Sequence, residues 1–255
     1  MPSWDADQYL RFAGERTRPC LDLAQRVALD QPARVIDLGC GPGNSTEVLA
    51  RRWPGAEVTG LDSSPEMIAA ARLARPDLRW IAADIAGWKA EAPCDLVFSN
   101  AALQWVPDHA ALFPRMLAQV APGGALAVQM PANFDAPAHR LMRDLAASPS
   151  WRASFPNAIR EWAVHEPAFY YDAVAPRAQR VDAWTTEYLH IMTGPEAIAE
   201  WYKGTGLRPF LDALPEADRP RFLADYTALL AGAYPRRADG KVLFPFLRLF
   251  LIAYV

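Results

Sequence analysis

The sequence predicts a doubly wound, mostly parallel α/β sheet, and three observations carry that prediction. An apolar run, Val35–Leu38, leads into alternating glycines and then into a helical pattern. A second apolar run ends in Asp62 and again precedes a helical pattern. Strand and helix patterns keep alternating as far as Gln129, which is typical of parallel strands joined by right-handed crossovers.

The periodicity predicts seven strands and the helices between them. Apolar runs bounded by turn residues predict strands at 34–38, 56–61, 78–82, 95–99, 125–129, 184–191 and 242–253. Helical spacing with caps and prolines predicts helices at 44–53, 65–74, 108–120, 195–203 and 216–233. The Pro122-Gly123-Gly124 stretch predicts a turn before the fifth strand.

We expect one domain over residues 1–255, with two additions to the sheet. Residues 1–30 mix aromatic and arginine residues with helical spacing, which predicts an N-terminal helical cap. Residues 131–183 interrupt the strand rhythm with prolines and scattered aromatics, which predicts a mainly helical insertion after the fifth strand. Open α/β sheets bind ligands at the carboxyl ends of their strands, so we expect this insertion to be a lid over the substrate site.

Net charge, apolar patterning and cysteine spacing argue against several classes of function. The formal net charge is −3, which does not favour a nucleic-acid partner, and no apolar run is long enough to predict a membrane span. The N-terminus lacks signal-peptide character, and Cys20, Cys40 and Cys94 are too widely spaced for a cysteine zinc site. We therefore expect a cytoplasmic protein with a small-molecule partner and no metal. Its oligomeric state stays open.

The ends of the first two predicted strands suit a nucleoside ligand. Gly39, Gly41 and Gly43 let a backbone turn approach a ligand closely, because glycine has no Cβ and tolerates positive φ. Asp62 closes the second strand, where ribose hydroxyls bind in doubly wound sheets. Together these residues predict a nucleoside site.

The glycine turn departs from the dinucleotide-binding pattern. Asn44 stands where that pattern needs its third glycine, and Asp37 would repel a diphosphate while suiting a ligand with a cationic amine. The segment 37–43 instead resembles the D-x-G-x-G-x-G motif of the class I S-adenosylmethionine-dependent methyltransferases. The resemblance implies a Rossmann-like fold and S-adenosyl-L-methionine as cofactor.

The resemblance also implies which residues hold the cofactor. The acid that closes the second strand, Asp62, would bind the ribose. The acid that closes the third, Asp84, would accept a hydrogen bond from the adenine amine, an interpretation that we favour over a helix cap or a turn. The implied cofactor-binding residues are Asp37, Gly39, Cys40, Gly41, Gly43, Asn44, Asp62, Ser63, Met67, Asp84, Ile85, Asn100, Ala101 and Gln104.

Narrower signals resemble the bacterial trans-aconitate 2-methyltransferases. Gln104-Trp105 and Gln129-Met130-Pro131-x-Asn133 are the more specific segments, and the N-terminal Trp4, Tyr9 and Arg16 agree with them. The match covers most of the first 145 residues and, more loosely, the remainder. It implies a carboxyl O-methyltransferase that forms a monomethyl ester of trans-aconitate or a similar small polycarboxylic acid.

A carboxylate substrate needs no general base. Carboxylic acids with a pKa of about 4 are ionised at neutral pH, so in-line transfer requires only orientation and exclusion of water. Gln104, Trp105 and His109 are the candidates near the reacting atoms, although Trp105 also fits ordinary core and His109 an exposed surface position. The substrate-binding candidates suit an anion and are Trp4, Tyr9, Arg11, Arg16, Arg18, Trp105, Asn133, His139, Arg143, Tyr170, Tyr171, Tyr202 and Lys203.

Three other functions stay open from the sequence. A methyltransferase acting on a phenol, an amine or a carbon acid would need a catalytic base over its substrate. A nicotinamide-dependent oxidoreductase is disfavoured by Asn44. A non-catalytic S-adenosylmethionine-binding protein is disfavoured because the motifs are intact.

Overall fold

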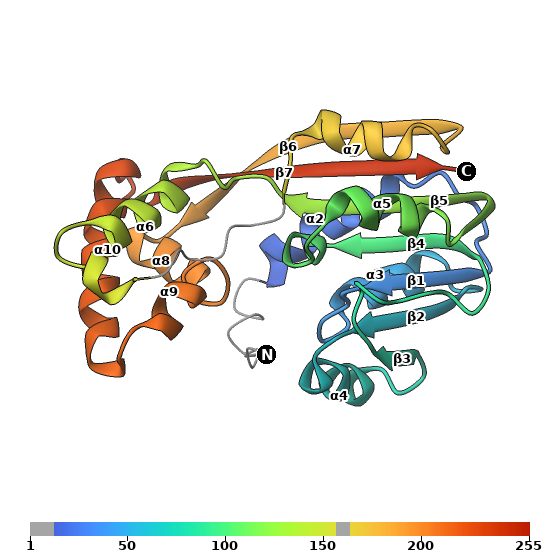
Figure 1. Cartoon of the computed structure of the whole chain (residues 1–255), viewed down its shortest axis with the longest axis horizontal. Coiled ribbons are helices and arrows are strands. Elements are labelled where there is room, and N and C mark those ends of the chain that lie inside the picture. Colours follow the sequence, from blue (N-terminus) through green and yellow to red (C-terminus); the bar gives the residue numbers. More distant parts are fainter. Residues whose placement is uncertain (1–12, 157–163) are drawn as a thin grey trace. The chain divides into compact units, whose positions relative to one another are not determined.

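The computed structural model describes residues 13–156 and 164–255 (Figure 1). The strands are β1 Arg34–Leu38, β2 Glu57–Asp62, β3 Arg79–Ala82, β4 Cys94–Asn100, β5 Val120–Pro131, β6 Arg180–Met192 and β7 Val242–Tyr254. The α-helices are α2 Ala13–Arg26, α3 Asn44–Arg52, α4 Pro65–Ala74, α5 His109–Leu117, α6 Pro137–Ala147, α7 Pro167–Val174, α8 Pro195–Lys203, α9 Arg208–Ala213 and α10 Arg219–Ala233. The short 3-10 helices are η1 Leu103–Trp105, η2 Arg152–Ser154 and η3 Glu216–Asp218.

The strands form a seven-stranded sheet with the order β3-β2-β1-β4-β5-β7-β6. β1 pairs in parallel with β2 and β4, and β5 pairs in parallel with β4 but antiparallel with β7. This confirms the predicted doubly wound, mostly parallel sheet. The strand order reverses between β1 and β4, and such switch points are where doubly wound sheets bind ligands.

The chain divides into two compact units. The first draws on residues 1–131, 163–186 and 248–255, and contains β1 to β5 with α2 to α5 and α7. The second draws on residues 132–162 and 187–247, and contains α6, α8, α9 and α10. The second unit thus combines part of the predicted insertion with the helices between β6 and β7. A lid role for the insertion stays a prediction.

The core of the first unit lies along its central strands. In β4, Leu96, Val97 and Phe98 have no exposed surface, and residues 125–128 of β5 are buried in the same way. Parallel strands that are covered on both faces are rich in consecutive apolar residues, which explains why these strands could be predicted from the sequence. In Figure 1, α5 lies in front of these strands; it packs against β5 and α7, whereas α2 packs against β5 and α3.

The fifth strand starts earlier than predicted. The Pro122-Gly123-Gly124 stretch lies inside β5, so the turn predicted there is wrong. The register with β4 shifts between the Cys94↔Val120 and Leu96↔Ala125 pairs, and the additional residues form an irregularity in the strand. Gly123 makes this possible because its φ is +81°, a conformation that costs glycine little.

The sixth strand is also longer than predicted. β6 begins at Arg180, whereas the apolar pattern places its start at Trp184. The added residues are partly exposed at the sheet edge, and Asp182 forms an ion pair with Arg26 at 2.7 Å. Apolar periodicity detects only the buried part of such a strand.

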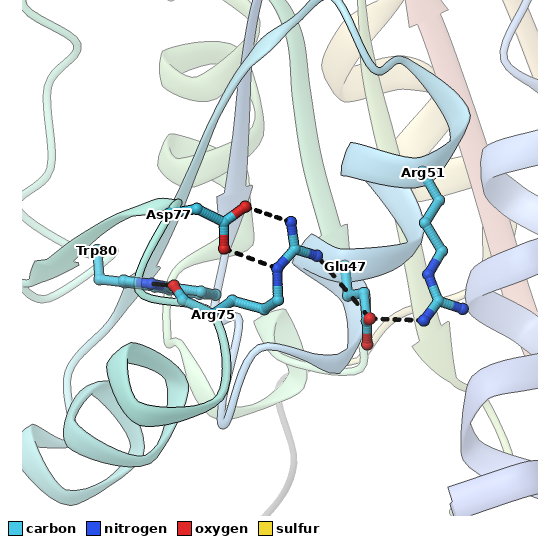
Figure 2. A network of polar contacts seen from close by, with 5 residues as sticks. All are labelled: Glu47, Arg51, Arg75, Asp77 and Trp80. Carbon is cyan, nitrogen blue, oxygen red and sulfur yellow. Dashed lines mark hydrogen bonds and ion pairs between the residues drawn. The ribbon is translucent and has the colours of Figure 1, made fainter.

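The ring of Trp80 in β3 packs against Gly43 of the glycine turn, and a hydrogen bond to the end of α4 fixes the position of the ring. The indole N–H of Trp80 donates to the carbonyl oxygen of Arg75 at 2.8 Å. The Arg75 guanidinium donates to both carboxylate oxygens of Asp77 and lies 3.8 Å from Glu47, which also pairs with Arg51 (Figure 2). Each exposed ion pair contributes little, but together they restrain the residues that follow α4.

None of the helices within 13–156 and 164–255 is both long and apolar enough to cross a lipid bilayer.

Candidate functional site

A cavity in the first unit opens at the carboxyl ends of β1 to β4. Its wall combines the glycine turn, the strand ends, η1 and one side of α2. Of the predicted cofactor residues, all except Asp37, Gly43 and Gln104 line it. The lining residues are Thr17, Cys20, Gly39, Cys40, Gly41, Pro42, Asn44, Ser45, Asp62, Ser63, Met67, Asp84, Ile85, Asn100, Ala101, Ala102, Trp105 and Val106.

The three glycines of the turn have different structural roles, although all have positive φ. A Cβ on Gly39 would lie 2.2 Å from the Cβ of Ala102, and one on Gly43 would lie 2.7 Å from the ring of Trp80. A Cβ on Gly41 would meet no atom of the described residues within 4 Å. Only Gly41 therefore leaves room for a ligand; Gly39 and Gly43 let the turn pack against its neighbours.

Asp62 ties the glycine turn to the start of α4. Its Oδ2 accepts the backbone N–H of Gly41 at 2.9 Å, and its Oδ1 accepts that of Ser64 at 2.8 Å. The Ser64 hydroxyl in turn caps α4 by accepting from the N–H of Met67. The carboxylate is thereby held at the cavity wall, as a ribose-binding acid must be.

Asp37 lies behind the turn and not on the cavity wall. It has no exposed surface, and its Oδ2 accepts from the hydroxyls of Ser45 at 2.6 Å and Thr46 at 2.7 Å. Burial raises the pKa of Asp37 to about 6, and the two hydroxyl donors oppose that rise. Its Oδ1 has no hydrogen-bond partner within the described residues. Asp37 thus orients Ser45, which does line the cavity.

The cavity favours a cationic ligand over a diphosphate. Two of its described lining residues are acidic, Asp62 and Asp84, and none is basic. The exposed carboxylate of Asp84 accepts from the N–H of Ala86 at 2.9 Å, so it serves a turn as well as the cavity. The Arg115 guanidinium donates to the carbonyl oxygens of Ile85 and Ala86 and holds this loop.

Two side chains, one at the end of β4 and one in η1 just after it, have buried acceptor oxygens without a hydrogen-bond donor among the described residues. The side-chain amide of Gln104 donates to the carbonyl of Ala101 at 2.7 Å, and Gln104 Oε1 is buried without a partner among the described residues. Asn100 Oδ1 is in the same state within the described part of the chain. Ala101 has a φ of +54°, a strained value for alanine, and strain of this kind concentrates at functional sites. These features fit a ligand that brings hydrogen-bond donors.

His109 is buried, so its interpretation as an exposed surface histidine is wrong. Its Nε2 lies 2.9 Å from the carbonyl of Leu103, an acceptor, so Nε2 carries the proton. Its Nδ1 then accepts from the hydroxyl of Tyr170 at 2.8 Å, and Tyr170 accepts from the N–H of His165. Burial lowers the pKa of His109. This neutral histidine links η1 to α7 and does not line the cavity.

Three substrate-binding candidates meet in the second unit. The Asn133 amide donates to the hydroxyl of Tyr202 at 3.0 Å, and the ring of His139 stands edge-on to Tyr202 with centroids 4.9 Å apart. All three are buried. The hydrogen-bonded pair and the adjacent imidazole form a polar patch inside an apolar region.

The other substrate candidates are scattered. Arg143 is half-exposed and donates to the carbonyl of Phe134, Lys203 pairs with Glu200 at 2.8 Å, and Tyr171 is 52% exposed. Arg18 is exposed, and Arg16 lies in α2. Trp4, Tyr9 and Arg11 lie outside the described residues. The described residues contain no cluster of three or more potential metal ligands.

The pH dependence of stability should reflect His139. Burial lowers the pKa of His139 from 6.5 to about 3, so the folded chain keeps it neutral where the unfolded chain protonates it. Acidification below pH 6.5 therefore favours unfolding, by about 2 kcal/mol at pH 5 from this residue. Urea unfolding at pH 7 and pH 5 should show that His139→Gln loses about 2 kcal/mol less than the wild type. An equal loss in both proteins would contradict this assignment.

Sequence reasoning missed one basic residue, Arg248. It is 4% exposed and is the one buried Lys or Arg among the described residues. The sequence does indicate that Arg248 is unusual, because it is a charged residue inside the apolar strand β7. Its Nη1 donates to Gln129 Oε1 at 3.4 Å.

The sheet, its switch-point cavity and the acidic lining define a Rossmann-like methyltransferase domain. Residues 12–208 match a family model described as a methyltransferase domain. The chain belongs to the trans-aconitate 2-methyltransferase family. It is 51% identical over 253 residues to the trans-aconitate 2-methyltransferase of Azoarcus sp. (strain BH72), covering 99% of each chain. It is 53% identical to that of Methylobacterium nodulans, covering 99% of this chain and 98% of the relative.

A solved structure supports the fold. The YcgJ protein of Bacillus subtilis superimposes with a TM-score of 0.60 at 12% identity, covering 93% of this chain and 98% of that one. The chain is therefore an S-adenosyl-L-methionine-dependent methyltransferase, and the oxidoreductase alternative is wrong.

Proposed function

We propose that the chain methylates a carboxylate oxygen of trans-aconitate, or of a similar small polycarboxylic acid, to give a monomethyl ester. The observation that carries this proposal is the identity of about half of all residues, over nearly the full length of both chains, with relatives named for trans-aconitate. A polycarboxylate also suits the absence of histidine and lysine among the described cavity residues.

The cavity residues are expected to hold the cofactor. Asp62 would bind the ribose hydroxyls and Asp84 the adenine amine, with buried Ile85 against the ring. The acceptor oxygens of Asn100 and Gln104 suit the donors at the amino-acid end. The acidic lining supports this arrangement because the ligand carries a positive charge. When bound, S-adenosyl-L-methionine supplies a methyl group activated by a sulfonium.

The residues of the chain then act by orientation. A carboxylate substrate is an anion at neutral pH, so no side chain has to remove a proton. Trp105 and buried Val106 line the cavity and would exclude water from the reacting atoms. His109 has both ring nitrogens engaged, so it positions η1 and does not act as a base.

Substrate binding is assigned to residues that suit an anion. Asn133, His139 and Tyr202 are kept as proposed substrate contacts because they form a buried polar patch in an apolar region. We retain residues 131–183 as a lid in this proposal. We also infer a cytoplasmic enzyme, which the three free cysteines support.

The test is methyl transfer from radiolabelled S-adenosylmethionine to trans-aconitate, with cis-aconitate, citrate and a fatty acid in parallel. A labelled product that is formed from trans-aconitate and released by base as volatile methanol is expected. Tight cofactor binding without transfer to any acid would overturn the carboxyl chemistry and leave the methyltransferase class intact.

A further inference from the structure

The last strand places a buried cation beside the cofactor cavity. Arg248 of β7 pairs in register with Pro131 of β5, two residues after Gln129. Alternate residues of a strand share one face, so Arg248 and Gln129 lie on the same face of the sheet, in agreement with their 3.4 Å contact. Both side chains are buried.

The polar atoms of this pair suit a carboxylate. Arg248 Nη1 donates to Gln129 Oε1, which leaves Gln129 Nε2 as the free end of the amide. That N–H₂ is buried and has no acceptor within the described residues. A buried donor without an acceptor is costly, and a planar guanidinium beside an amide N–H₂ matches the oxygens of a carboxylate.

Gln129 is one strand away from the strand end that lines the cavity, and Arg248 is two strands away. Gln129 of β5 is the register partner of Asn100 of β4, which lines the cavity. The Gln129 carbonyl also accepts the N–H of Ala101 at 2.9 Å. Neighbouring strands are separated by about 4.8 Å, so Gln129 is within the length of a tricarboxylic acid from the end of β4, and the guanidinium of Arg248 reaches Gln129 from the next strand.

We propose that Arg248 and Gln129 form a subsite that binds one carboxylate of the substrate and so selects polycarboxylic acids. This inference rests on the proposed function. The bound carboxylate is one that is not methylated, because strong hydrogen bonds to a guanidinium withdraw charge from a nucleophilic oxygen. The subsite predicts a preference for acids with several carboxylates over fatty acids.

The experiment measures binding and turnover separately. Calorimetric titration of trans-aconitate into protein saturated with S-adenosylhomocysteine gives the Kd of the acid, and titration of S-adenosylhomocysteine alone reports the cofactor site. The variants are Arg248→Gln, Arg248→Lys and Gln129→Glu. Arg51→Gln is the control, since Arg51 is exposed on α3.

Arg248→Gln is expected to weaken trans-aconitate binding about 10- to 100-fold and to raise KM similarly, with cofactor affinity changed by less than about twofold. Arg248→Lys keeps the charge but loses the planar fork, so an intermediate loss is expected. Gln129→Glu is nearly isosteric and would neutralise the guanidinium, so it should lose acid binding even if Arg248→Gln fails to fold. Arg51→Gln should behave as the wild type.

Wild-type acid binding by Gln129→Glu, or by a folded Arg248→Gln, would overturn the subsite while leaving the proposed function in place. A wild-type protein that neither binds nor methylates any carboxylic acid would overturn both. Equal weakening of acid and cofactor would show that Arg248 is structural, and would also overturn the subsite.

Discussion

Replacing Gly39 by alanine is expected to destabilise the protein by about 4 kcal/mol and to abolish tight binding of S-adenosylmethionine. The new Cβ would lie 2.2 Å from the Cβ of Ala102 and 3.4 Å from Cδ1 of Ile85. Overpacking costs about 1–3 kcal/mol, and a left-handed φ of +77° adds about 1–2 kcal/mol for alanine. Relief of the collision moves the turn that forms the cavity wall. Urea unfolding and calorimetry measure the two effects.

Gly41→Ala distinguishes the cost of a left-handed φ from the cost of steric overlap, because only the first applies at position 41. Gly41 also has a left-handed φ, +54°, but its added Cβ would meet no atom within 4 Å in the part of the chain that the structure describes. Its expected cost in stability is therefore about 1 kcal/mol, although the methyl group would project toward the cavity and weaken cofactor binding. Gly55→Ala, in open space without positive φ, should change neither quantity much. If Gly39→Ala were no less stable than Gly41→Ala, contact with Ala102 would not be what requires glycine at position 39.

Replacing Asp62 by alanine is expected to weaken cofactor binding by about 1–3 kcal/mol, roughly 10- to 100-fold in Kd. The substitution removes the proposed ribose contact. It also frees the N–H groups of Gly41 and Ser64, which the carboxylate accepts at 2.9 and 2.8 Å. The glycine turn and the start of α4 would then lose their shared anchor. Calorimetric titration with S-adenosylhomocysteine measures the change.

Two variants control this result. Asp62→Asn keeps one acceptor oxygen, so it should lose less affinity than Asp62→Ala. Asp30→Ala removes an exposed acid outside the cavity and should leave the affinity unchanged. Cofactor binding by Asp62→Ala as tight as that of the wild type would show that the ribose assignment is wrong.

The central sheet could be predicted because its strands are buried on both faces. Buried apolar residues identify β1 and β4, although each strand also contains an aspartate, and the helix at Pro65–Ala74 follows from a serine cap and a proline. The edge strand β6 and the irregular start of β5 were misplaced, because exposed or bulged strand residues carry no apolar period. The packing role of Gly43 was also missed, since nothing near it in sequence indicates Trp80.

The sequence by itself determined the fold class and the cofactor, and it predicted that Asp62 and Asp84 lie at the site, where both line the cavity, because these features depend on local patterns at strand ends. It could not determine which side chains of the other elements meet. Only the tertiary structure decided that His109 is a buried link to Tyr170 and that Arg248 lies beside Gln129, since these pairs are separated by 61 and 119 residues. Contacts between residues that are far apart in the sequence depend on strand register and helix packing, and the local spacing of residues does not predict them.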